Sequence, residues 1–428
     1  MAGLSAAAWS VRHGRSVTLV ERGTLGGSAL HAGFLWTAPS LEILRREVPD
    51  GDPALAERLI DDFSPALDWV RSLGVECQPA VDVLRFGRGH QTAIRNYLRA
   101  CELTIRGDVR SAIVPAETRQ LVVKDGVVRG AELLVADGAS QIVRAQATVL
   151  ATGGFQGDPD LRASLIHPHA RDIPVRGNPY SRGDGLRLGL AAGARFGADG
   201  AGFYGHLMPA GVPLADDDDL PALTLYYSEH AVLLNLDGRR FVDETVGDHL
   251  TAMALVEQPE ARGLLVSDAR VREEWILRPY VEGIRPTDTF DTCFRRGARA
   301  AIAEDLDELA FVPPEWGYHG DQIREALVDF NRRCRGGSLE PPRRHDATAI
   351  DRPPFYVIET VPAITFTFGG LLVDADARVL AGDLGPIPGL LAAGADAGGL
   401  YVHAYAGGLA AALTFGLRAA RTALEEAA

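Results

Sequence analysis

The sequence contains few of the residues that crosslink a chain or bind zinc. Its four cysteines, in 428 residues, are widely spaced and form no C-x-x-C pair. This spacing excludes zinc-ribbon and dithiol redox motifs and fits a reducing compartment. The chain also lacks an apolar run of membrane-spanning length and a recognisable signal peptide. We therefore expect a cytoplasmic protein without an integral membrane segment.

Basic residues are scarce as well. Lys and Arg number 43 against 57 Asp and Glu, which gives a formal net charge of −14. This charge disfavours nucleic-acid binding, which requires a basic face that displaces counterions. The acidic run over 216–219 is expected to be a solvated loop and not a metal site, because the ligands of a hard cation usually alternate with other residues.

Glycine is abundant, with 47 residues, and several glycines follow buried apolar runs. The strand in QATVLATGGF ends at Thr152-Gly153-Gly154, and GLLAAGADAGG repeats this pattern near the C-terminus. Glycines directly after a strand let backbone approach a ligand closely, at the sheet edge where α/β folds bind cofactors. The other patterns predict a helix over 1–13, a strand over 16–21, a hairpin turn at 124–126, a helix over 185–195 and a closing helix over 405–426.

The first 21 residues match the later part of a dinucleotide-binding unit. In such a unit the order is strand, G-x-G-x-x-G, helix, strand and acid. The helix, the second strand and the acid Glu21 are present here, whereas the first strand and the first two glycines are not. Residues from about 205 to 355 carry more Pro, Trp, Tyr and charge at irregular spacing, so we expect an insertion into the nucleotide domain.

Seven motifs then occur in a family order: ERGTLGGSALHAGFLW, ATGGFQGDPDL, GDGLRLGLAAGA, LNLDGRRFVDE, PPFYVIE, TFGGLLVDADARVL and PIPGLLAAGADAGG. On these motifs nearly the whole chain resembles the fumarate reductase/succinate dehydrogenase flavoprotein superfamily. That group includes soluble fumarate reductases, urocanate reductases, tricarballylate dehydrogenases and 3-ketosteroid Δ1-dehydrogenases. The resemblance implies an α/β fold. A Rossmann-like FAD-binding domain of the glutathione-reductase type would span 1–203 and 358–428, with an inserted α+β capping domain over 204–357.

Members of the superfamily normally begin with a strand and G-G-G-x-A-G, and Met1-Ala2-Gly3 corresponds to the last three residues of that motif. Gly3 would then let the helix pack on the sheet. We expect upstream residues that supply the strand and the pyrophosphate turn, because a missing central strand leaves buried backbone groups unpaired at about 1–3 kcal/mol each. On this expectation residues 1–428 alone bind FAD poorly, and a short upstream extension restores tight binding.

The resemblance implies FAD as the cofactor, and the absence of a second G-x-G-x-x-G unit disfavours NAD. Ala395 replaces the glutamate that usually follows Gly394, and Asp396 comes next. The amides that open the closing helix can stabilise negative charge on the reduced flavin. His31 does not stand at the place of the histidine that some relatives link to FAD, so we expect non-covalent binding. The predicted cofactor contacts are Gly3, Glu21, Arg22, Gly26, Gly27, Ser28, Thr152, Gly153, Gly154, Asp184, Gly394, Ala395, Gly407, Gly408 and Leu409.

The catalytic positions depart from those of soluble fumarate reductases. The proton-delivering arginine of those enzymes corresponds to Arg272 in GLLVSDARVREEW, and the acid of their proton relay corresponds to Glu244. The positions that differ are the relay arginine (Gly247), a substrate-carboxylate histidine (Thr365 or Phe366) and a carboxylate-binding arginine (Tyr405). A dicarboxylate would lose charge-assisted hydrogen bonds worth about 1.5–3 kcal/mol each, which disfavours fumarate as the substrate.

The segment HAYAGGLAAALTFG resembles the closing segment of the ketosteroid dehydrogenases, in which a tyrosine hydroxyl and a glycine amide hold a substrate ketone. The resemblance implies that Tyr405 polarises a carbonyl, and a phenol is a neutral donor suited to an oxygen that becomes enolate-like. His206 is a candidate match to a carboxylate-binding histidine. Further acid/base candidates are Tyr226, Tyr227 and His403, for which simple packing is the alternative.

The predicted enzyme is an FAD-dependent oxidoreductase acting on CH–CH bonds. It would transfer a hydride between the flavin and a carbon next to an activating carbonyl, exchange a proton at the neighbouring carbon, and so form or reduce a C=C bond. The expected substrate is a neutral or weakly charged enone, and the electron donor or acceptor is unknown. Two alternatives remain: a dicarboxylate or tricarballylate oxidoreductase, and a non-catalytic flavin-binding relative. A subunit of a membrane-bound respiratory complex is disfavoured.

Overall fold

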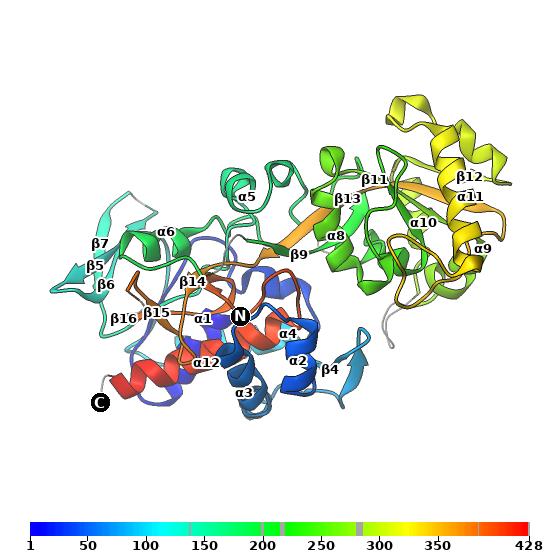
Figure 1. Ribbon diagram of the computed structural model, residues 1–428. Helices are drawn as coiled ribbons and strands as arrows, with labels where there is room; N and C mark the ends of the chain where they lie inside the picture. The colour runs from blue at the N-terminus through cyan, green and yellow to red at the C-terminus, as the bar shows by residue number, and fades with distance from the viewer. Residues whose placement is uncertain (137, 198–200, 215–218, 280–285, 384, 427–428) are drawn as a thin grey trace. The chain divides into compact units, whose positions relative to one another are not determined.

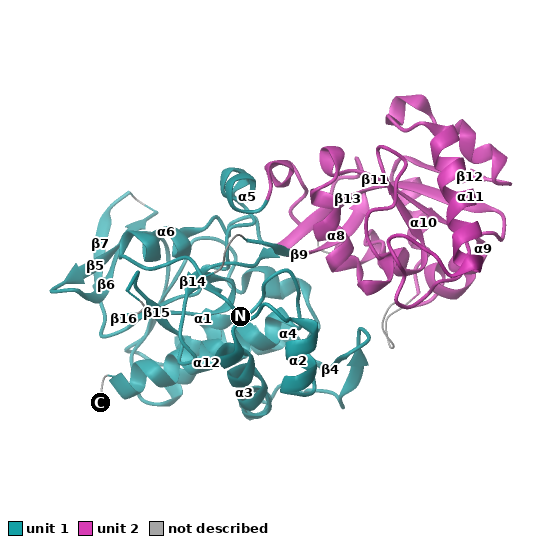
Figure 2. Cartoon of the chain, in the orientation of Figure 1, with its two compact units in different colours: residues 1–166, 177–203, 366–428 teal, residues 167–176, 204–365 magenta. Residues whose placement is uncertain are grey.

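The computed structural model describes residues 1–428 except 137, 198–200, 215–218, 280–285, 384 and 427–428. Most of the acidic run over 216–219 thus lies outside the described residues. The chain forms two compact units, which Figure 2 distinguishes by colour. Unit 1 comprises Met1–Ile166, Gly177–Phe203 and Phe366–Ala428, and unit 2 comprises His167–Arg176 and Tyr204–Thr365. The functional domain boundaries at 203 and 357 stay a prediction, because contacts alone define these units.

Unit 1 combines helices with several small sheets (Figure 1). Its helices are α1 (Ala2–Arg12), α2 (Leu41–Glu47), α3 (Pro53–Ser72), α4 (Ile94–Arg106), α5 (Pro159–Leu165), α6 (Asp184–Ala191) and α12 (Gly408–Glu426). Its strands are β1 (Thr18–Glu21), β2 (Phe34–Thr37), β3 (Val81–Val83), β4 (Gly87–Gln91), β5 (Ala112–Lys124), β6 (Val127–Val135), β7 (Ser140–Arg144), β8 (Thr148–Leu150), β14 (Leu371–Leu372), β15 (Arg378–Leu380), β16 (Pro386–Ala392) and β17 (Ala397–Gly398).

The core of unit 1 brings the two ends of the described chain together. Helix α1 packs against α12 and α4, because its alanines allow close approach and its buried side chains include Leu4 and Trp9. A Cβ on Gly3 would lie 3.3 Å from Cβ of Ala151, and a Cβ on Gly416 would overlap the backbone of Ala2. Glycines therefore allow two close contacts of α1. Gly3 lets the helix approach Ala151, the residue after β8, and Gly416 lets α12 approach Ala2.

Unit 1 contains two parallel strand pairs and a hairpin. Strand β1 pairs in parallel with β5, within the order β1-β5-β6-β7, and β16 pairs in parallel with β8. Strands β5 and β6 form a hairpin whose turn residues Asp125 and Gly126 have φ of 54° and 74°. The helix over 1–13, the strand over 16–21, this hairpin, the strand before Thr152 and the closing helix are thus confirmed, each with slightly shorter bounds.

Unit 2 is built on an antiparallel sheet with the strand order β10-β11-β13-β12, and β9 also pairs with β13. Its strands are β9 (Phe203–Pro209), β10 (Val232–Asn235), β11 (Gly263–Ser267), β12 (Ala300–Ala303) and β13 (Phe355–Thr367). Its helices are α7 (Asp219–Ala222), α8 (Asp248–Val256), α9 (Ala269–Val271), α10 (Thr289–Arg295) and α11 (Gly320–Gly336). The α+β character expected for the inserted region is confirmed.

Candidate cofactor and substrate sites

The end of β1 is tied to the start of α6. The Glu21 carboxylate accepts the Gly23 amide at 2.8 Å, which closes the turn directly after the strand. Arg22 pairs with Asp184 at 2.9 Å and donates to the Tyr180 carbonyl at 2.6 Å. Three residues predicted to contact the cofactor (Glu21, Arg22 and Asp184) therefore lie together, although 162 positions separate Arg22 from Asp184 in the sequence.

The loop with Gly26 and Gly27 meets a segment that the sequence did not single out. Both glycines have positive φ (107° and 56°), a backbone region in which side chains are strained. The Ser28 hydroxyl accepts the Asn178 amide at 2.9 Å, and the buried Gln156 donates to the Asn178 carbonyl at 3.3 Å. Ser28, Gln156 and Asn178 thus hold three loops of unit 1 in one place.

The turn Thr152-Gly153-Gly154 is held by a fully buried carboxylate, that of Asp396. Its Oδ1 accepts the Thr152 hydroxyl at 3.0 Å and the Gly154 amide at 3.2 Å, and its Oδ2 accepts the Thr152 amide. Burial raises the pKa of Asp396, and these three donors oppose that shift. Gly394 and Ala395 immediately precede this acid. The sequence alone did not indicate a role for Asp396, although an acid directly after a buried strand and a glycine was the available signal.

The start of α12 is the fourth part of unit 1 that contains predicted cofactor contacts, after the end of β1, the loop at Gly26 and the turn at Thr152. Gly407 has φ of 97°, and a Cβ there would overlap the Trp36 carbonyl oxygen. The Gly408 amide donates to the hydroxyl oxygen of Tyr405 at 2.9 Å, and burial raises the pKa of Tyr405 to about 12. Leu409 continues the first turn of the helix. The ring of Tyr405 packs among Trp36, Phe366, Phe368 and Tyr401.

These turns fit FAD. A Cβ on Gly153 or Gly154 would lie within 3.0 Å of Ser181 Oγ or Thr367 Oγ1, so this turn requires glycine at both positions. Beside Gly154, the buried Gln156 has an Oε1 atom without a hydrogen-bond partner among the described residues. A buried acceptor without a partner is satisfied by a ligand donor, and FAD carries such donors on its ring and its ribityl chain.

A second polar cluster lies in unit 2, around His206 on β9. Its Nδ1 bonds to Asp248 at 2.5 Å, and both side chains are buried. Burial lowers the pKa of His206, Arg176 adds to the lowering, and Asp248 opposes it. Burial alone would raise the pKa of Asp248, but His206 lowers it. Tyr226 packs edge-on to His206, with ring centroids 5.4 Å apart. The sequence predicted His206 and Tyr226, but not Asp248 or Arg176.

His249, beside Asp248, gives the cluster an expected pH dependence. Burial lowers its pKa from 6.5 to about 4. Between these values the unfolded chain binds more protons than the folded one, so stability rises with pH across this window. We expect the free energy of unfolding to fall by about 3 kcal/mol as the pH drops from about 7 to about 4. Urea unfolding across this range measures it, and an unchanged pH slope in His249→Gln would contradict it.

Arg272 lies in a different polar group of unit 2. Its Nη1 donates to Asp288 Oδ1 at 3.3 Å, its Nη2 also bonds to Asp288, and its guanidinium stands 4.8 Å from the ring centroid of Tyr356. Tyr227 is within electrostatic range, and burial raises the pKa of its hydroxyl. That hydroxyl has no hydrogen-bond partner among the described residues. The sequence did not reveal Asp288, which now stands as the acid partner of Arg272.

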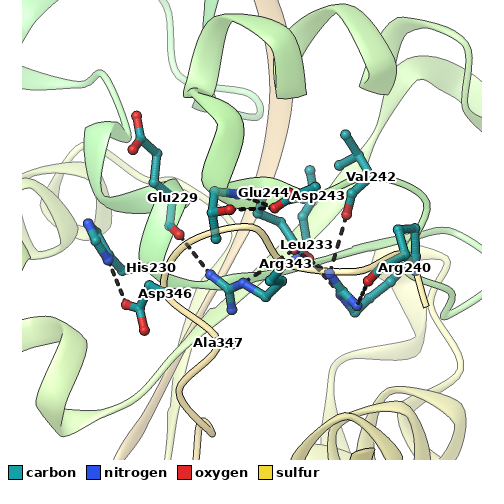
Figure 3. A network of polar contacts seen from close by, with 12 residues as sticks. Glu229, His230, Leu233, Arg240, Val242, Asp243, Glu244, Arg343, Asp346 and Ala347 are labelled. Carbon is teal, nitrogen blue, oxygen red and sulfur yellow. Dashed lines mark hydrogen bonds and ion pairs between the residues drawn. The ribbon is translucent and has the colours of Figure 1, made fainter. Parts of the chain in front are cut away.

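Glu244 belongs to a separate group of polar contacts, which Figure 3 shows. It is fully buried and accepts from Arg240 at 2.6 and 2.9 Å and from the Leu233 amide at 3.1 Å, while Arg343 Nε lies 3.8 Å away. Among the described residues Glu244 therefore does not pair with Arg272, and the corresponding relay contact is not made. His403, a further candidate, has an exposed side chain 3.7 Å from Asp50.

Comparison with known proteins agrees with this geometry. The family model described as FAD binding domain matches residues 1–411. The NADH:acrylate oxidoreductase of Vibrio harveyi is 26% identical over 84% of this chain and 35% of its own length. The fumarate reductase (cytochrome) of Shewanella frigidimarina is 26% identical over 100% of this chain and 75% of its own length. The chain thus spans about a third of the first relative and three quarters of the second.

The fold has solved counterparts. The 3-ketosteroid delta1-dehydrogenase of Sterolibacterium denitrificans superimposes with a TM-score of 0.78 at 16% identity, over 99% of this chain and 98% of that chain. The fold and the glycine turns therefore define an FAD-binding flavoprotein. The chain belongs to the FAD-binding domain family, within the fumarate reductase/succinate dehydrogenase flavoprotein superfamily. No helix among the described residues has the length and apolar character to cross a bilayer.

Proposed function

We propose that the protein binds FAD non-covalently and forms or reduces a C=C bond next to a carbonyl. The observation that carries the proposal is that unit 1 contains both the glycine turns and the buried Tyr405, whose hydroxyl oxygen accepts the first amide of α12, that of Gly408. The family match supports the cofactor. The names of the relatives, an acrylate oxidoreductase and a fumarate reductase, support a reaction at a C=C bond that a carbonyl activates.

Bound FAD supplies two-electron chemistry, because it accepts or gives a hydride and an external electron carrier restores it. Residues of this chain bind the substrate carbonyl and exchange the proton. Tyr405 donates its O–H to the substrate carbonyl oxygen, and the Gly408 amide strengthens that donor by bonding to the same phenol oxygen at 2.9 Å. Arg272 exchanges the proton at the neighbouring carbon. Reduction therefore consumes one hydride and one proton for each C=C bond, and oxidation releases both.

Reoxidation of the reduced holoprotein tests this function. We expect but-3-en-2-one, crotonate or cinnamate to reoxidise it under anaerobic conditions, as followed by the return of flavin absorbance. Tyr405→Phe should slow this step about 10²-fold, because it deletes a hydrogen-bond donor to an oxygen that gains charge. It also removes the acceptor of the Gly408 amide, at about 1 kcal/mol of stability. If none of these compounds reoxidises the protein, the proposed function is wrong; reoxidation by fumarate would then indicate the dicarboxylate oxidoreductase, and its absence would favour the non-catalytic flavin-binding relative.

A further inference from the structure

Arg176 is a buried arginine that the proposed chemistry has not used. The segment ending at Arg176 is fixed to β13, since the Arg176 amide donates to the Ile364 carbonyl at 2.7 Å. The side chain is 8% exposed. Its guanidinium donates to the hydroxyls of Thr224 (3.1 Å), Thr365 (3.3 Å) and Tyr226 (3.2 Å) and to the Leu220 carbonyl (3.4 Å). All four acceptors are neutral.

This pattern differs from that of two partly buried arginines of unit 2, Arg240 and Arg262. Arg240 pairs with Glu244 at 2.6 Å and Arg262 with Glu359 at 2.8 Å. Among the described residues, Arg176 has no carboxylate within ion-pair distance. Asp248 is within electrostatic range of Arg176, but its hydrogen bond goes to His206. Because a buried charge is costly unless an opposite charge or strong acceptors compensate it, a cation of this kind indicates an anionic ligand.

Donors remain available at this position. A guanidinium has five N–H groups, and the four hydrogen bonds leave one on Nη1. His206 Nε2 has no partner in the part of the chain that the structure describes, where the hydrogen bond of this ring is made by Nδ1. Tyr226 connects the two residues, because its hydroxyl accepts from Arg176 and its ring packs against His206. Arg176 also reaches Thr365, a position at which the superfamily histidine is replaced.

We propose that Arg176 receives a carboxylate of the substrate and that the substrate is a monocarboxylate with a conjugated C=C bond. This inference rests on the proposed function and narrows it, because it replaces the neutral enone expected from the sequence. Two carboxylate-binding positions of the superfamily are replaced in this sequence, at 365–366 and at 405, and Arg176 comes from a segment that no motif covers. A single guanidinium compensates one carboxylate, so fumarate, with two, is not favoured.

Ligand binding to the oxidised holoprotein tests the role of Arg176 without turnover. Crotonate and crotonamide differ in charge but hardly in shape, as do cinnamate and cinnamamide. We expect the dissociation constant of a carboxylate to be about 10- to 100-fold lower than that of the matching amide. Calorimetry or flavin difference spectra measure both constants. Arg176→Gln should abolish this preference, and fumarate should bind no better than crotonate. Equal affinities in the wild type, or a preference that survives Arg176→Gln, would overturn the inference.

Two further variants separate binding from folding. Thr365→Val removes one acceptor of Arg176 but keeps the charge, so the preference for carboxylates should remain. Arg176→Lys also keeps the charge and should retain part of the preference; this variant serves if Arg176→Gln does not fold. If carboxylates bind through Arg176 but do not reoxidise the reduced protein, the proposed function fails while the inference stands. If they reoxidise it regardless of the residue at 176, the inference fails alone.

Discussion

Asp396→Asn is expected to yield a folded chain that does not retain FAD. The carboxylate of Asp396 accepts three donors, all from the turn Thr152-Gly153-Gly154. An asparagine directs an N–H₂ group at one of those donors, so at least one buried hydrogen bond is lost and two donors face each other, at about 1–3 kcal/mol. Without these hydrogen bonds the turn is no longer held in its present conformation, in which Gly153 and Gly154 have positive φ.

Flavin absorbance per chain after gel filtration measures the effect, and far-UV circular dichroism shows whether the chain is folded. Asp52→Asn is the matched control. Asp52 also accepts two backbone amides, those of Ala54 and Leu55, but it caps α3, a role that asparagine fulfils as well. We expect Asp52→Asn to retain as much FAD as the unmutated protein and Asp396→Asn to retain almost none of that amount. Wild-type FAD content in Asp396→Asn would show that this turn does not hold the cofactor.

Arg272→Gln is expected to slow the reaction with substrate by about 10²- to 10⁴-fold, the range for loss of a proton-transfer group. Glutamine is also polar and can donate a hydrogen bond to Asp288, but its side chain is neutral and cannot transfer a proton as the guanidinium would. The flavin spectrum should not change, because the partners of Arg272, Asp288 and Tyr356, are not among the residues predicted to contact FAD. Single-turnover reoxidation of the reduced protein isolates the step.

Arg270→Gln provides the comparison for this prediction. Arg270 lies two residues away and is also held by an acid, Asp346, at 3.3 Å. If charge in this region were all that mattered, both variants would be slow. We expect only Arg272→Gln to be slow. Near-normal turnover in Arg272→Gln would move the proton-transfer role to Tyr226, Tyr227 or His403.

The sequence predicted the parts of the fold that depend on local patterns. The hairpin at 124–126 requires residues that tolerate positive φ, and Asp125-Gly126 meets that requirement. The alanine-rich run over 1–13 fits only a helix that packs closely on its neighbours. Gly153 was identified because a glycine that follows a buried strand typically allows a turn that other residues would strain, whereas Gly26 and Gly407 were predicted from the family resemblance. Their conformations, all with positive φ, agree with that interpretation.

The residues that the sequence did not reveal act through contacts with distant parts of the chain. Asp396 bonds to a turn 242–244 positions earlier, and Arg176 reaches Thr365 across 189 positions. No local pattern marks either residue, since an isolated acid or arginine is usually exposed. Glu244 shows the converse: its motif suggested a proton relay, but nearby Arg240 holds it in a buried ion pair. Motif similarity identified the position and not the partner.

The contact between α1 and α12 has a consequence for synthesis on the ribosome. About four hundred residues separate the two helices, so α1, with Leu4 and Trp9, leaves the exit tunnel long before its partner is made. At translation rates of about 5–20 residues per second, that interval is on the order of 20–80 s. During this time the side of α1 that packs against α12 stays uncovered and is available to chaperones, whereas α4 and the sheet of unit 2 can form before α12 is translated.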